Sequence, residues 1–145
     1  MITYPMTFKV SSKSNSGINS QWSTQAQAYP SAAIQMAIPP EFEGPGHGYS
    51  PEDIYAIALQ NCFIATFKVF AEKSKLQFNS VQIESDLIVD RDEKGRPWMS
   101  KILMRVTVLG VANSDTAKRI LEKTSQNCMI LNSVKTEKEF TFEIQ

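Results

Sequence analysis

The sequence predicts an α+β fold, and three observations lead to this prediction. The longest apolar segment, residues 50–70, opens with a strong helix-start signal. Strand-like segments lie on both sides of it in the chain, and a second segment with helical periodicity follows. The chain has 145 residues without an internal repeat or a dividing linker. We therefore expect one α+β domain over residues 1–145, large enough to bury a core without disulfides.

The N-terminal part of the chain is predicted to be β-structure followed by a loop. Residues 12–17 have the composition of a turn, and residues 38–49 form a Pro/Gly-rich loop in which Pro39 and Pro40 exclude a helix or a central strand. Three short segments alternate as strands do: Thr7–Val10, Ile18–Gln27 and Ala32–Ala37.

The segment after this loop predicts a buried helix from Pro51 to about Ser74. Ser50 can cap it, Pro51 suits its first position, and Glu52 and Asp53 place carboxylates in its first turn. Apolar residues cover nearly its whole circumference, so we expect protein on all sides of it. Cys62 lies near its middle and should be shielded from bulk water.

The C-terminal half predicts two antiparallel strands, a helix and a last strand. The polar residues 90–97 join the two strands, and Ser114 is predicted to cap the helix. The three predicted strands are Phe78–Val89, Trp98–Leu109 and Val134–Ile144. The buried stripe of the helix comprises Ala117, Ile120, Leu121, Thr124 and Cys128.

Composition excludes several classes of function. The 15 basic and 15 acidic residues cancel, so no basic surface for nucleic acid or an anionic membrane is expected. No apolar run is long enough for a transmembrane helix, and the first residues do not resemble a signal peptide. We therefore expect a cytoplasmic protein, in which the two cysteines are either buried spectators or a redox pair.

The run PPEFEGPGHGYSPEDIYAIALQNCF, followed by a second cysteine at the end of a later helix, resembles the OsmC/Ohr family of thiol-dependent peroxidases. Its most specific part is the Ser-Pro-Glu cap with a cysteine ten residues after the glutamate. The resemblance implies curved antiparallel sheets wrapped around a long central helix. It also implies an intertwined homodimer with its sites at the interface.

The resemblance further implies a role for three residues. Cys62 matches the peroxidatic cysteine, Cys128 the resolving cysteine and Glu52 the acidic residue of the site. The implied substrate is an organic hydroperoxide, and the implied reductant is a dithiol of the lipoyl type. No metal or other cofactor is expected. Two positions depart from the family pattern: the N-terminal strands have no arginine, only Lys9 and Lys13, and Met129 stands where a proline is common.

Geometry adds a constraint on Glu52. Ten helical residues separate it from Cys62, about 15 Å along the axis, so it would reach a thiol of the partner chain more easily than its own. Without the resemblance, Glu52 is simply a favourable charge at a helix start.

Five residues could wall an apolar substrate pocket, although as core or loop residues they need no function: Phe42, His47, Tyr49, Phe63 and Phe67. The alternative to a peroxidase is an OsmC-like dimer that binds an apolar ligand or senses redox state.

Overall fold

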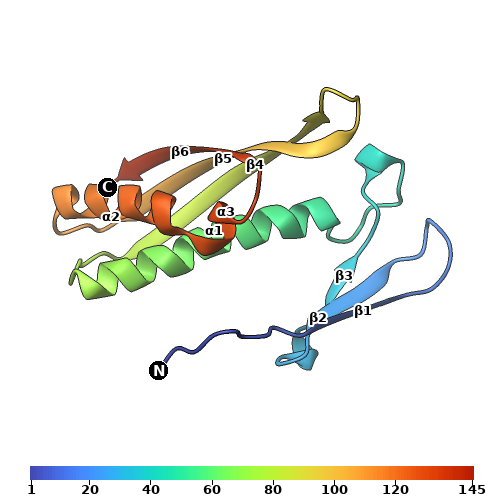
Figure 1. The fold of residues 1–145 in the computed structure, drawn as a ribbon, viewed down its shortest axis with the longest axis horizontal. Coiled ribbons are helices and arrows are strands. Elements are labelled where there is room, and N and C mark those ends of the chain that lie inside the picture. Colours follow the sequence, from blue (N-terminus) through green and yellow to red (C-terminus); the bar gives the residue numbers. More distant parts are fainter. The chain divides into compact units, whose positions relative to one another are not determined.

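A computed structural model describes every residue from Met1 to Gln145. The predicted α+β class is confirmed (Figure 1). The chain forms two compact units, Met1–Ile54 and Tyr55–Gln145, and helix α1 begins in the first and continues through the second. In chain order the strands and α-helices are β1 (Val10–Ser14), β2 (Trp22–Ala26), β3 (Ile34–Met36), α1 (Pro51–Lys73), β4 (Ser80–Arg91), β5 (Pro97–Leu109), α2 (Ser114–Asn127), α3 (Met129–Asn132) and β6 (Glu137–Ile144).

The first unit contains a three-stranded antiparallel sheet in the order β1-β2-β3. The predicted strand at Thr7–Val10 is displaced: β1 begins only at Val10 and includes residues that were expected to form a turn. Pairing with β2 explains the shift, because the Ser12 and Thr24 hydroxyls hydrogen-bond across the strands at 2.7 Å. The turn follows instead at Gly17, whose φ of +103° is open to glycine.

The start of α1 forms a reciprocal cap, as predicted from Ser50. The Ser50 hydroxyl accepts a hydrogen bond from the Asp53 amide, and the Asp53 carboxylate accepts one from the Ser50 amide, each at 2.9 Å. Two backbone donors at the helix start are thereby satisfied. The helix ends at Lys73, close to the predicted end at Ser74. The cap thus fixes the point from which every α1 side chain is counted, including Cys62.

The second unit contains a three-stranded sheet in the order β4-β5-β6. Strands β4 and β5 form the predicted antiparallel hairpin, but β6 runs parallel to β5. The sheet is therefore mixed rather than wholly antiparallel. The reason is the connection, since helix α2 carries the chain back to the starting end of β5, as parallel pairing requires.

The core of the second unit lies between this sheet and helices α1 and α2, which cover the same face (Figure 1). Phe63 of α1 is fully buried and packs against Phe140 and Phe142 of β6, with ring centroids 5.6 and 6.1 Å apart. Phe67 packs edge-on against Phe78 at 5.3 Å. The aromatic cluster fixes the rotation of α1 against the sheet, and so the direction in which Cys62 points.

Helix α1 is less enclosed than its sequence predicted. Its buried residues form one stripe, Leu59, Phe63, Phe67 and Ala71. The opposite face stays exposed in the single chain: Val69 retains 51% of its accessible surface. By length and composition alone α1 could cross a membrane, contrary to the sequence prediction. Its capped, charged first turn and its aromatic packing against the sheet are instead those of a core helix.

Helix α2 begins at Ser114, one residue earlier than a cap at Ser114 predicts, and its cap is Asn113. The Asn113 side-chain oxygen accepts a hydrogen bond from the Thr116 amide at 3.1 Å. The predicted stripe faces the core, and all five of its residues are buried. The short helix α3, which the sequence did not predict, follows Cys128 and delays the start of β6 to Glu137.

The position of this cap gives a testable difference between neighbouring residues. Asn113→Ala is expected to lower the free energy of unfolding by about 1 kcal/mol, because the Thr116 amide loses its acceptor. Ser114→Ala should change it by less than about 0.5 kcal/mol, since no cap bond is lost. Urea unfolding of both variants measures the difference. Equal decreases in the free energy of unfolding of the two variants would contradict the assignment of the cap to Asn113.

Candidate thiol site

The structure brings the two cysteines together within the second unit. Cys62 lies in the middle of α1, and Cys128 is the single residue between α2 and α3. Both are free thiols, and they are close enough to hydrogen-bond through their side chains. Only the packing of α1 against the α2–α3 junction pairs them, because they are far apart in the sequence. A reversible disulfide requires two thiols that lie close together, as these do.

The two thiols lie in different surroundings. Cys128 is fully buried, whereas Cys62 is only half-buried. Burial, followed by a hydrogen bond and an electrostatic interaction with Cys62, raises the pKa of Cys128 to about 11. Hydrogen bonds from the Leu131 amide and the Thr66 hydroxyl act in the opposite direction. Cys128 therefore remains a protonated thiol near neutral pH, and Cys62 is the more accessible sulfur.

A backbone group also contacts the Cys62 sulfur. The amide of Ile130, in α3, donates a hydrogen bond to Cys62 Sγ at 3.4 Å. Sequence analysis missed this donor because every residue except proline has an N–H group, so the pattern of side chains holds no trace of it. Free amides occur at helix starts, and the sequence did not predict the start of α3.

Glu52 lies in the first turn of α1, as predicted. One of its carboxylate oxygens, Oε2, is buried and has no hydrogen-bond partner. A buried acceptor without a donor is unfavourable and uncommon in folded proteins. Within the single chain this oxygen has no hydrogen-bond donor.

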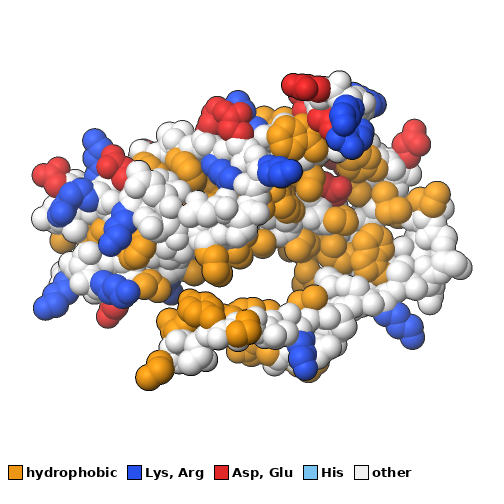
Figure 2. Space-filling model, in the orientation of Figure 1, with side chains coloured by type: hydrophobic (Ala, Val, Ile, Leu, Met, Phe, Trp, Pro, Cys, Tyr) orange, Lys and Arg blue, Asp and Glu red, His pale blue; other side chains and the backbone are white.

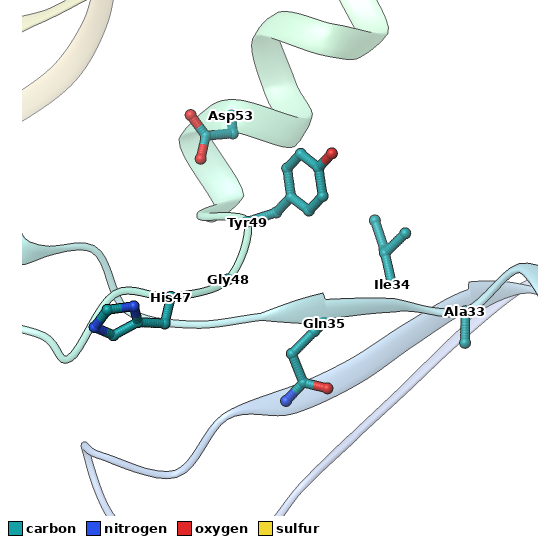
Figure 3. A pocket seen from close by; sticks show the side chains of 7 residues that line it. All are labelled: Ala33, Ile34, Gln35, His47, Gly48, Tyr49 and Asp53. Atoms are coloured by element: carbon teal, nitrogen blue, oxygen red, sulfur yellow. The ribbon is translucent and has the colours of Figure 1, made fainter.

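A surface pocket of about 560 Å³ lies within the first unit (Figure 3). Tyr49 and Ile34 project on one side of β3, and Gln35 projects on the other. Its lining residues are Ala33, Ile34, Gln35, His47, Gly48, Tyr49 and Asp53. Two of the predicted pocket residues, His47 and Tyr49, thus line an open pocket of mixed polarity at the start of α1.

The other three predicted pocket residues lie elsewhere. Phe63 and Phe67 are fully buried in the core of the second unit, where they pack against other aromatic rings. Phe42 is the last residue of a short 3-10 helix, Pro40–Phe42, and is 47% exposed. This packing accounts for Phe63 and Phe67 without a substrate. No group of three or more metal-ligating side chains is present.

The fold and the thiol pair together define a class of small α+β thiol proteins, in which a long helix presents one cysteine to a second at a helix end. Comparison with known families identifies the class. The model of the OsmC-like protein family matches residues 44–143. The chain therefore belongs to the OsmC-like family, which confirms the resemblance in its sequence.

Individual relatives agree with this assignment. The uncharacterized protein YmaD of Bacillus subtilis is 30% identical over 113 residues, covering 74% of this chain and 75% of YmaD. An OsmC-like protein of unknown function from Vibrio cholerae has a TM-score of 0.83 at 16% identity, over 95% of this chain and 99% of the other. An organic hydroperoxide resistance protein OsmC from Legionella pneumophila has a TM-score of 0.71 at 19% identity, over 97% and 99%. These two structures share the fold of this chain.

Proposed function

We propose that this protein is a thiol-dependent peroxidase that reduces organic hydroperoxides, with Cys62 as the attacking thiolate and Cys128 as the resolving thiol. The observation that carries the proposal is the pairing of the half-buried Cys62 with the buried Cys128 across α1 and the α2–α3 junction. Family membership adds support, as does the shared fold with proteins named for organic hydroperoxide resistance.

The proposed cycle has three steps. The Cys62 thiolate attacks the terminal peroxide oxygen, the O–O bond breaks, and the alkoxide leaves with a proton as an alcohol while Cys62 becomes a sulfenic acid. The Cys128 sulfur then displaces water from the sulfenic acid and forms the Cys62–Cys128 disulfide. An external dithiol, of the lipoyl type, reduces this disulfide by exchange and is itself oxidised. A reducing compartment such as the cytoplasm would supply that dithiol.

The partial exposure of Cys62 suits this order of steps. A hydroperoxide can reach Cys62 but not Cys128, which has no accessible surface. Because Cys128 retains its proton near neutral pH, it remains available until the sulfenic acid forms. Accessibility and protonation together therefore support attack at Cys62 followed by closure at Cys128.

We also propose that the working form is a homodimer. Residues near the N-terminus alternate between apolar and polar side chains, and the apolar ones are exposed (Figure 2). These are Ile2 (74%), Tyr4 (77%), Met6 (48%), Phe8 (83%) and Val10 (71%). Residues 2–8 thus have the pattern of a strand with an apolar face but no strand partner. A second copy of the chain would cover this face and the exposed side of α1, and could supply the donor that Glu52 lacks.

One observation favours the alternative, an OsmC-like dimer that binds a ligand or senses redox state. Residues 1–54 contain no arginine, so the N-terminal strands offer no guanidinium to a thiolate. A lysine there would be a point charge without the planar fork of arginine.

The deciding experiment follows free thiols while the reduced protein is titrated with cumene hydroperoxide or a fatty-acid hydroperoxide. A peroxidase should lose both of its thiols per chain and regain them on addition of dihydrolipoamide. The organic peroxides should act faster than hydrogen peroxide. Thiols that stay reduced under excess hydroperoxide would contradict the proposal and favour the ligand-binding dimer.

A further inference from the structure

The Ile130 amide has no acceptor inside its own helix. Ile130 is the second residue of α3, and the first hydrogen bond that closes this turn runs from the Asn132 amide to the Cys128 carbonyl. The N–H groups at the first positions of a helix need partners from outside it. The partner here is Cys62 Sγ at 3.4 Å, within the range of a hydrogen bond to sulfur.

We propose that the Ile130 amide holds the Cys62 sulfur as a thiolate, with the Cys128 thiol as a second donor, so that the second unit of the chain supplies its own thiolate-binding site. The inference rests on the proposed peroxidase function for its purpose, but the hydrogen bond itself does not depend on it. These donors come from residues 128–130, so they would take the place of the arginine that is absent from the N-terminal strands.

The surroundings of the sulfur pair support this assignment. The groups placed on the two sulfurs are the amides of Ile130 and Leu131, the Thr66 hydroxyl, and the cysteines themselves. Cys128 is the titratable group facing Cys62 among them, and its raised pKa keeps it a donor rather than a competing anion. A hydrogen bond to an ionised sulfur favours the ionised form, which is the effect proposed for these donors.

The position before Ile130 explains a departure from the family pattern. Met129 occupies the first position of α3, where proline is tolerated because no helical N–H bond is required there. Cys128 has φ −75° and ψ 115°, the extended backbone that a residue before proline prefers. Met129 is 68% exposed, so its side chain contributes little packing. A proline or a methionine at position 129 therefore leaves the Ile130 amide in place.

The decisive test removes the Ile130 N–H and keeps every side chain, although the Met129 carbonyl, which accepts from the Ser133 hydroxyl, becomes a weaker ester acceptor. Cys128 allows a synthetic segment of residues 128–145 to be ligated to a thioester of residues 1–127, with the amide at Ile130 replaced by an ester. A matched protein carries the ester at Met129. The readout is the pH dependence of Cys62 alkylation by iodoacetamide, followed by mass spectrometry of the peptide that contains Cys62.

The ester at Ile130 is expected to raise the midpoint of Cys62 alkylation by about 1 pH unit, which means about tenfold less thiolate below the midpoint. The ester at Met129 should leave the midpoint unchanged. Met129→Pro and Ile130→Pro provide the genetic version, with the same expected order. An unchanged midpoint in the Ile130 ester, or equal shifts in both esters, would overturn the inference.

Alkylation needs no peroxide, so the two proposals fail separately. Thiols that resist hydroperoxide together with a shifted midpoint would reject the peroxidase and keep the thiolate-binding amide. Rapid oxidation of the thiols by hydroperoxide with an unshifted alkylation midpoint would keep the peroxidase and reject the thiolate-binding amide. If both proposals are correct, the rate of reaction with cumene hydroperoxide at a pH below the alkylation midpoint should also fall about tenfold in the Ile130 ester, in proportion to the lost thiolate.

Discussion

Cys62→Ser is expected to abolish hydroperoxide consumption, whereas Cys128→Ser should still allow a single reaction at Cys62. A serine hydroxyl does not ionise near neutral pH and is a poor nucleophile toward peroxide, so no first step remains in the Cys62 variant. In the Cys128 variant the sulfenic acid forms but finds no second thiol. Excess peroxide should then convert it to the sulfinic acid. Intact-mass measurement distinguishes a protein with added oxygen atoms from one with a disulfide.

The pH dependence of the second step gives an internal control. In the reduced protein the pKa of Cys128 is raised to about 11 by burial, by its hydrogen bond with Cys62 and by the charge there. Oxidation of Cys62 to a neutral sulfenic acid removes the charge but not the burial, so the pKa of Cys128 should fall yet stay above its usual value. Disulfide closure should therefore accelerate with rising pH, by up to about tenfold per unit below that pKa. For the two serine variants described above, the same oxidation products in Cys62→Ser and Cys128→Ser would contradict the assignment of roles.

The sequence predicted the helices and strands where local signals were strong. The Ser50–Asp53 segment placed the start of α1 correctly, because a cap, a proline and a carboxylate there act through local contacts. The buried stripe of α2 was predicted for the same reason. Local signals failed at β1, where pairing with β2 decides the register, and at α2, where Asn113 competed successfully with Ser114 for the cap.

The thiol site was predictable only in part. The two cysteines are the only ones in the chain and lie on predicted helices, so their meeting was a plausible hypothesis from the sequence. The Ile130 amide was not, since a backbone donor has no residue-specific signal and α3 is too short to give a periodic pattern. The unsatisfied Glu52 oxygen depends equally on tertiary packing, which fixes the burial of single atoms.

The exposed side of α1 leads to the second large expected effect. Residues of this side recur at helical spacing opposite the buried stripe: Ala58, Asn61, Ala65, Val69 and Glu72 are all exposed. Four of these five side chains are uncharged, an unusual composition for a helix face that meets water. If a second copy of the chain covers it, the central Ala65 is buried in the dimer.

Ala65→Glu should therefore convert the protein from a dimer to a monomer in sedimentation at micromolar concentration. Burying an unpaired carboxylate costs about 3–5 kcal/mol, which weakens association by roughly two to four orders of magnitude. Glutamate is a good helix former, so the fold of the single chain should survive, as circular dichroism would show. Gln126→Glu adds the same charge to the exposed side of α2 and should remain dimeric. A dimeric Ala65→Glu variant would exclude this side of α1 from the interface and leave the apolar N-terminal segment, residues 2–10, as the surface that joins the two chains.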